Sequence, residues 1–464
     1  MKGCLRFLIV VLLIAALASY FVVTKGPALL EDAKTYLDGA LERYHRFIGL
    51  FSSEGGESQE PPAGEGDGSG GDSGGDHAGD YGDYKPSVPV DTTLEATLRQ
   101  GLSNMDSKID LSALSPTKDA VKNAMSAIIY SSPEYFYLRS EYSISSNNRG
   151  VQSITVTYNG TKTEIAAKKQ VYESKIAEIV AGAPINGTDF DKILYLHDYF
   201  ITNYTYDNSL TVRDAYTFFV GKTGVCQAYM LALIATAREL GIESIPVTSD
   251  PMKHAWNLVK IDGRWYHVDL TWDDTVSYPT FTSYRYFLQS DAGLFAIDAD
   301  KKESDRHREW VAAESATDTK YDHASYRNAQ TPIVKDGGVY YVAVPVENQT
   351  TTVHGAVLSG TDVTAMSHFC DVVGGYWMAG QSSFYRDCYA GLAVSGGYLY
   401  YNSGNTVVRV SLSTPGVTRS VTVSGLMPGE SIYGILGVEN GTVTYLKSVA
   451  PSEAATATAT CEIK

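Results

Sequence analysis

The chain has 464 residues, 44% hydrophobic and 19% charged, which is typical of a globular protein long enough for two or three domains. Its formal net charge of −16 argues against a nucleic-acid partner, because neutralising phosphates needs clustered Lys and Arg. Five scattered cysteines without a Cys-x-x-Cys pair or a Cys/His cluster argue against a disulfide scaffold and a zinc site.

Residues 1–26 have the pattern of a membrane anchor. After Lys2 and Arg6, a mostly apolar run of seventeen residues extends from Phe7 to Val23, near the short end for a membrane span of ~20 residues. Ala16-Leu17-Ala18 also resembles a signal-peptidase site, so a cleaved signal peptide is the alternative. We favour the uncleaved anchor because apolar residues continue past that site. Either way, we expect the bulk of the chain to be exported, membrane-bound in the first case and secreted in the second.

Two further segments precede the globular region. Residues 27–51 carry an apolar stripe at alternating spacings of three and four, which predicts an amphipathic helix that lies on the membrane or forms a short stalk. Residues 52–90 are rich in Gly, Ser and acidic side chains. Between Ser52 and Tyr84 there are nine carboxylates and no Lys or Arg. This composition cannot build a core and predicts a flexible, self-repelling linker.

The rest of the chain divides at a change of pattern. Residues 91–325 mix helical and strand periodicities and predict an α+β domain. Residues 326–464 show recurring short strands with Gly-rich turns, which predict an all-β domain of sandwich or propeller-like sheets. In that domain, Cys370 and Cys388 are either small core residues or a single disulfide. Helices are expected at 117–129, 168–181, 189–203 and 227–240, and a strand at 151–158.

Cys226 occupies an unusual place, between the turn residue Gly224 and an apolar helix that ends before Gly241. At a helix N-terminus, unpaired N–H groups and the helix dipole favour an anion. That setting lowers a thiol pKa and produces a nucleophilic thiolate. The same N–H groups can stabilise an oxyanion. A buried cysteine acting as a small hydrophobe is the simpler alternative.

The stretch HAWNLVKIDGRWYHVDLTWDD supplies a candidate base. It predicts two strands joined by a two-residue turn at Asp262-Gly263, with opposed residue numbers that sum to 525. In that register His254 faces Thr271, and both Asp269 and Asp273 are its diagonal neighbours. A carboxylate at either position could orient the imidazole, and spacing alone does not choose between them.

The other histidines and the tryptophans of this region have structural interpretations. His267 shares the face but lies opposite Leu258, farther from the strand end, and His197 is expected to be a hydrogen-bonded helix residue. The three tryptophans are expected to be core and groove-lining aromatics (Trp256, Trp265 and Trp272).

Taken together, GVCQAYMLALIATARELGI, HAWNLVKIDGRWYHVDLTWDD and the preceding ILYLHDYFITNYTYD resemble the core of bacterial transglutaminase-like proteins. The resemblance is strongest over residues 189–274. It implies a papain-like α+β core in which Cys226 is the nucleophile, His254 the general base and acid, and Asp269 the orienting acid. It thereby favours Asp269 over Asp273.

The resemblance implies acyl transfer at an amide through a Cys226 thioester, without a cofactor or metal. Gln227 replaces the tryptophan of animal transglutaminases and no acidic calcium cluster is evident, which argues against calcium activation and net cross-linking. We therefore favour a peptidase or amidase over a transglutaminase. Protein or cell-wall peptides are the expected substrates. A non-catalytic cell-surface binding protein on the same fold is the alternative.

Overall fold

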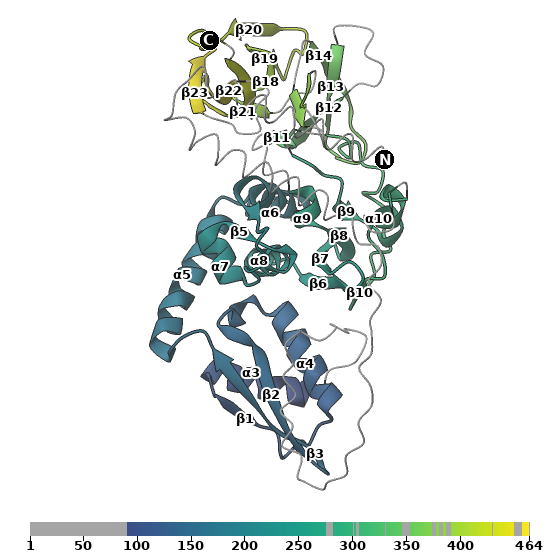
Figure 1. Cartoon of the computed structure of the whole chain (residues 1–464). Helices are drawn as coiled ribbons and strands as arrows, with labels where there is room; N and C mark the ends of the chain where they lie inside the picture. The colour runs from purple at the N-terminus through teal and green to yellow at the C-terminus, as the bar shows by residue number, and fades with distance from the viewer. Residues whose placement is uncertain are drawn as a thin grey trace, which may run out of the picture. The chain divides into compact units, whose positions relative to one another are not determined.

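Figure 1 shows the chain as a computed structural model, which describes residues 91–274, 282–299, 301–302, 306–329, 331–345, 353–373, 377–379, 384–386, 391–428, 430–449 and 457–463. All of these residues belong to one compact unit, Gly74–Lys464. The anchor, amphipathic helix and linker predicted for residues 1–90 lie outside the described residues. Within the described ranges, no helix is long and apolar enough to cross a membrane.

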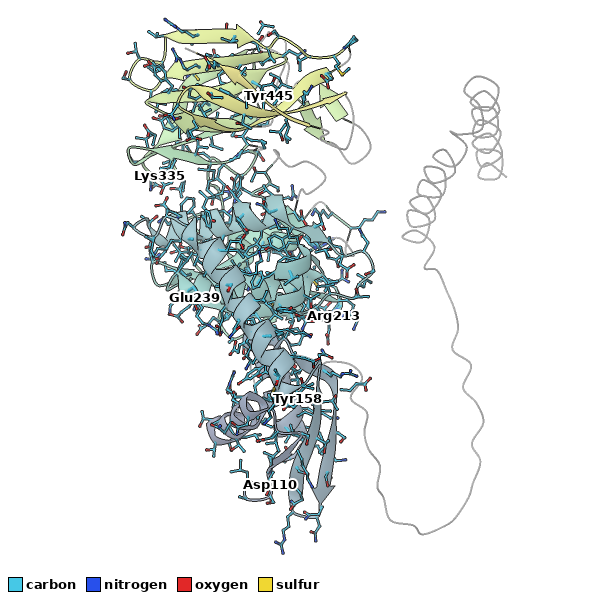
Figure 2. All side chains as sticks on the ribbon, turned by 90° about the vertical axis from the view of Figure 1, so that its left-hand side faces the viewer. Asp110, Tyr158, Arg213, Glu239, Lys335 and Tyr445 are labelled. Carbon is cyan, nitrogen blue, oxygen red and sulfur yellow. The ribbon has the colours of Figure 1, made fainter. Side chains whose placement is uncertain are left out.

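The first described elements form a three-stranded antiparallel sheet, in the order β1-β3-β2, packed against two helices. Their bounds are α3 (Thr92–Asn104), β1 (Lys108–Asp110), α4 (Lys118–Ser131), β2 (Leu138–Asn147) and β3 (Gly150–Tyr158). Leu94, Leu98 and Leu102 recur every four residues on α3 and are buried in the core that the helices share with the sheet. Figure 2 labels Asp110 at the end of β1 and Tyr158 at the end of β3.

The centre of the next region is a buried helix, α8 (Cys226–Glu239). Every side chain from 227 to 237 is buried, so this helix is enclosed on all sides rather than on one face. One side packs on strands of a five-stranded antiparallel sheet ordered β10-β6-β7-β8-β9, and other sides pack on α5, α6 and α7. The strands are β6 (Ser244–Ser249), β7 (His254–Ile261), β8 (Arg264–Val268), β9 (Phe287–Gln289) and β10 (Val311–Ala312). The helices are α5 (Lys162–Ala181), α6 (Asp189–Asn203), α7 (Ala215–Gly221), α9 (Leu270–Asp273) and α10 (Asp291–Ile297).

The hairpin of β7 and β8 has the predicted register. Ile261 pairs with Arg264 and Asn257 with Val268, and both turn residues have positive φ, of 50° at Asp262 and 78° at Gly263. The prediction was wrong about the strand end. β8 stops at Val268 and the chain turns into α9, so Thr271 does not face His254.

Four of the predicted elements are confirmed with small shifts at their ends: the helices α4, α6 and α8 and the strand β3. The helix predicted at 168–181 begins earlier, at Lys162, because Thr161 caps it: the Thr161 side chain accepts the N–H of Glu164, whose carboxylate accepts the Thr161 N–H. The helix α3 and the strand β2 were not predicted.

The C-terminal region consists of antiparallel sheets, as expected. Two four-stranded sheets run in sequence order, β11-β12-β13-β14 and β17-β18-β19-β20, and a three-stranded sheet follows them, β21-β22-β23. The strands of the first sheet are β11 (Val334–Asp336), β12 (Val339–Pro345), β13 (Val353–Gly360) and β14 (Ser367–Val373). Those of the other two include β17 (Leu392–Ser395), β19 (Thr406–Ser411), β20 (Thr418–Thr422), β21 (Glu430–Glu439) and β23 (Ala457–Glu462). Along β18 (Tyr398–Ser403), Leu399 and Tyr401 pack toward the first sheet, and Tyr400 packs toward the third. The middle sheet is therefore buried on both faces. Figure 2 labels Tyr445 on β22 (Thr442–Val449), a strand of the third sheet.

Candidate active site

Cys226 is the first residue of α8, as the sequence predicts. The preceding turn is fixed by β5 (Thr223–Gly224), which pairs in parallel with β4 (Thr205–Tyr206). A Cβ on Gly224 would lie 2.6 Å from Phe218 Cδ2 and 2.7 Å from Ala228 Cβ, so only glycine fits. Among the described residues, no side chain caps this helix end. The helix dipole and the N–H groups of its first turn are thus available to an anion at Cys226.

The Cys226 thiol lies beside His254 and the backbone N–H of Ala255, both of which favour its anion. Burial opposes ionisation of the thiol. The interaction with His254 outweighs it, and the pKa of Cys226 is lowered. The other two described cysteines differ, because burial raises the pKa of Cys461 and raises that of Cys370 to about 12. Both carry free thiols, and Cys388 lies outside the described residues.

His254 begins β7 and connects the thiol to Asp269. Its Nε2 donates to Asp269 Oδ2 at 2.6 Å, which leaves Nδ1 as the ring nitrogen for the thiol. Burial disfavours the imidazolium. The charge and hydrogen bond of Asp269, followed by those of Cys226, override it and raise the pKa of His254 to about 10. The structure therefore brings Cys226, His254 and Asp269 together, with the imidazole of His254 between the thiol and the carboxylate.

A fourth residue, His307, also contacts Asp269 and was not predicted from the sequence. Its Nε2 donates to Asp269 Oδ2 at 2.9 Å, and its Nδ1 lies 2.9 Å from Asp298 Oδ2. Asp269 is 1% exposed. Burial alone would favour its neutral form, but His254 and His307 hold the pKa of this carboxyl well below its usual range. A single carboxylate oxygen thus accepts hydrogen bonds from two imidazoles.

Aromatic rings enclose the imidazole of His254. Trp256 lies on one side with ring centroids 5.4 Å apart at 21°, and Trp272 stacks at 5.5 Å and 29°. Trp272 also contacts His307, at 4.2 Å between ring centroids. These contacts fix the plane of the imidazole and keep water from its faces, as a proton-transferring group requires. Trp256 is buried in a core cluster, as expected, and Trp265 and Trp272 pack against that cluster.

Asp273 belongs to a separate buried cluster. Its Oδ2 lies 3.3 Å from His197 Nε2 and accepts the Tyr286 N–H at 3.0 Å, while Oδ1 accepts from Ser283. His197 lies on α6, and its other ring nitrogen faces Asp198 at 2.9 Å. Burial would lower the pKa of His197, but Asp198 and Asp273 raise it to about 9. His197 is the hydrogen-bonded helix histidine expected, and Asp273 anchors α9 to α6.

His267 does not reach the site. It pairs with Leu258 as predicted, and its ring accepts from Trp256 Nε1 at 3.0 Å and donates to Asp291 at 2.8 Å. Burial is the main cause that lowers the pKa of His267. His267 thus fixes the position of the Trp256 indole through this hydrogen bond.

Tyr206, on the strand next to the Cys226 turn, is a further neighbour of the site that sequence reasoning did not single out. Burial, and after it the charge of Cys226, raises the pKa of the Tyr206 hydroxyl, with a smaller contribution from Asp269. The hydroxyl is therefore neutral at physiological pH and can donate a hydrogen bond.

Among the described residues, one group of ligating side chains has a spacing that could hold a metal: His254, Asp269 and His307, whose ligand atoms lie within 4.8 Å of one another. In this structure the three side chains contact one another directly, with Asp269 Oδ2 2.6 Å from His254 Nε2 and 2.9 Å from His307 Nε2.

Residues 176–270 match the sequence model of the Transglutaminase-like superfamily. The part of the chain that carries Cys226, His254 and Asp269 is thus a transglutaminase-like superfamily domain, in agreement with the resemblance read from the sequence. The comparison with curated protein sequences returned no match.

Two solved structures show partial likeness to this chain. One is a transglutaminase (TGase) with 16% identity, a TM-score of 0.20, and coverage of 29% of this chain and 43% of the other. The second is a candidate cysteine protease from Cytophaga hutchinsonii with 16% identity, a TM-score of 0.19, and coverage of 28% and 61%. This chain thus spans less than two thirds of either protein. At such scores the likenesses are too partial to bear on function.

Proposed function

We propose that this protein is a cysteine hydrolase that cleaves amide bonds of peptides through a Cys226 thioester. The observation that carries the proposal is the 2.6 Å hydrogen bond from His254 to Asp269, with the Cys226 thiol beside the same imidazole. A thiol of lowered pKa, a histidine of raised pKa and a buried ionised carboxylate are the parts that this chemistry needs.

The reaction follows from these positions. The Cys226 thiolate attacks the amide carbon, and the carbonyl oxygen becomes an oxyanion near the N–H groups that begin α8. The neutral Tyr206 hydroxyl would supply a second donor. The His254 imidazolium gives its proton to the leaving amine as the C–N bond breaks, and a thioester remains. His254 then takes a proton from water, which attacks the thioester and releases the acid.

Asp269 keeps His254 in the required tautomer throughout these steps. It accepts the Nε2 proton, so that Nδ1 exchanges protons with the thiol, the leaving amine and water.

Water is the acceptor that we favour over an amine. The cavity beside Gln227, the neighbour of Cys226, is lined largely by polar side chains that admit water. An amine-selective enzyme would need to exclude water from the thioester.

Peptide profiling tests this proposal. The wild-type protein and Cys226→Ala are incubated with a defined peptide library, with and without an added primary amine. We expect cleaved peptides with the wild type only, and little amine incorporation. Amine-linked products in excess of cleaved ones would make the protein a transglutaminase. No product with either protein would favour the binding-protein alternative.

We further propose that the protein is exported and held at the membrane by residues 1–26, with residues 52–90 as a flexible tether. The apolar run from Phe7 to Val23 and the acidic, glycine-rich composition after Ser52 support this layout. Limited proteolysis of membrane-bound protein should cut the tether first and release a soluble fragment that begins near Asp91. A protected tether, or a fragment that loses thiol reactivity, would contradict it.

A further inference from the structure

A cavity of about 700 Å³ begins one residue from the nucleophile. One wall is the segment from Ser132 to Arg139 with the first part of β2 and the end of β3. The opposite wall is the loop from Thr211 to Asp214 and the side of α8 where Gln227 and Leu231 line the cavity. Cys226 itself does not line the cavity, but Gln227, the next residue in the first turn of α8, does, so a peptide that passes from the thiol over this turn would reach the cavity.

Gln227 is a buried polar side chain without a partner. It is 5% exposed, and no described residue forms a hydrogen bond with its amide. Its amide atoms are not among the fully buried unpaired atoms, so they keep contact with the cavity, where their donors and acceptor are open to a ligand. A primary amide offers one acceptor and two donors, which match the N–H and C=O groups of a peptide backbone.

Two arginines line the same cavity, Arg139 and Arg213, and neither forms an ion pair with a described residue. Figure 2 labels Arg213, which is exposed. The guanidinium group binds a carboxylate through two parallel hydrogen bonds, which makes it the residue type suited to this recognition.

The lining carboxylates do not neutralise these arginines. Asp214 caps α7, where its side chain accepts the Thr217 N–H at 2.8 Å, and burial raises the pKa of this carboxyl. Glu141 is exposed, on the same strand as Arg139.

The walls of the cavity are held in place before any ligand binds. Phe136 stacks on Tyr216 with ring centroids 4.8 Å apart, which fixes the first wall to the helical core. On the other side, the Asp207 carboxylate accepts the N–H groups of Thr211 and Val212 at 2.8 and 2.9 Å. A site fixed in this way loses little entropy when a peptide binds.

We propose that this cavity is the substrate subsite next to Cys226, and that it takes a polar peptide segment bearing a free carboxylate. Gln227 pairs with the peptide backbone and Arg213, with Arg139, pairs with the carboxylate. The proposal rests on the cysteine chemistry proposed above and adds the class of substrate.

Matched electrophilic peptides test the subsite without knowledge of the natural substrate. Chloroacetyl-Gly-Glu and chloroacetyl-Gly-Gln amide both alkylate a thiolate by forming a C–S bond and releasing chloride. The first probe carries carboxylates, and the second has neutral amides in their place. We expect the full-length protein to react about tenfold faster with the acidic probe at low ionic strength. Arg213→Gln should abolish this preference, and Glu141→Gln should increase it. Gln227→Ala should slow both probes and keep their ratio.

Two controls separate this proposal from the proposed function. Lys260→Gln removes a positive charge that pairs with Glu243 outside the cavity, and should leave the ratio unchanged. Chloroacetamide, which lacks the peptide, should react equally with the wild type and Arg213→Gln. If chloroacetamide fails to label Cys226, the cysteine chemistry itself is wrong. If it labels Cys226 but the two peptide probes react equally in the wild type, the subsite proposal alone is overturned.

Discussion

Replacing Asp269 by asparagine should disable the thiol without unfolding the protein. The carboxylate accepts from His254 at 2.6 Å, from His307 at 2.9 Å and from the Trp272 N–H at 3.1 Å. An amide of the same shape presents an N–H₂ group or a neutral oxygen to the two imidazoles. His254 then loses its charge partner and the tautomer that serves Cys226.

The magnitude follows from the pKa of His254, which is raised from 6.5 to about 10. That difference corresponds to about 5 kcal/mol, and Asp269 is the largest favourable contributor. If Asp269→Asn removes half of this free energy, the thiolate–imidazolium pair is destabilised by about 2 to 3 kcal/mol, which lowers its population about 100-fold. The alkylation rate of Cys226 by chloroacetamide should fall about 100-fold at pH ~6, where a free thiol is protonated. The deficit should shrink as the pH approaches ~9, where the free thiol ionises unaided.

Asp273→Asn is the matched control, because it removes the same charge four residues away. Asp273 accepts from His197, Tyr286 and Ser283, and does not contact His254 in the described structure. We expect a wild-type alkylation profile and a loss of about 3 kcal/mol in the free energy of unfolding by urea. A profile for Asp269→Asn that matches the wild type, or the reverse ranking of the two variants, would refute the assignment of the acid.

Three further predictions concern the surroundings of the site. His307→Gln removes one of the two imidazole donors to Asp269 and should slow alkylation at pH ~6 about tenfold, by weakening the charge that supports His254; an unchanged rate would make His307 purely structural. The pKa of His197 is raised from 6.5 to about 9, so its stabilisation is complete below pH 6.5 and is lost as the pH rises through 9. His197→Gln should therefore cost about 3 kcal/mol at pH ~6 and progressively less toward pH ~9 in urea unfolding, and a pH-independent cost would contradict the assignment. Gly224→Ala places a methyl group against Phe218 and Ala228 and should destabilise the fold by about 1 to 3 kcal/mol, whereas an unshifted urea midpoint would show that the turn can relax.

The parts of the site that the sequence predicted depend on local signals. The turn at Asp262-Gly263 sets the register of β7 and β8, and that register brings Asp269 within reach of His254. The apolar run after Cys226, ended by Gly241 at a φ of 76°, defines the helix whose first residue is the thiol.

The parts that the sequence did not predict depend on long-range contacts. His307 meets Asp269 across 38 residues, and no periodic pattern in between predicts that meeting. Residue spacing alone did not decide between Asp269 and Asp273, because both would be diagonal neighbours of His254 if the second strand of the hairpin continued past them. The strand ends at Val268, and α9 carries Asp273 toward His197 instead. Only the tertiary fold separates these two acids.

The thiol of Cys226 tests the central claim most directly. Thiolate absorbance in the ultraviolet is measured against pH for the wild type and for Cys226→Ala, and subtracting the variant's curve from that of the wild type gives the ionisation of this one residue. Because His254 and the N–H groups at the start of α8 stabilise the anion, we expect the thiolate to form well below the pKa of ~8.5 of a free cysteine and to react before Cys370 and Cys461. Ionisation at or above ~8.5, with labelling no faster than at the other cysteines, would show that Cys226 is a buried structural residue and that the proposed cysteine chemistry is wrong.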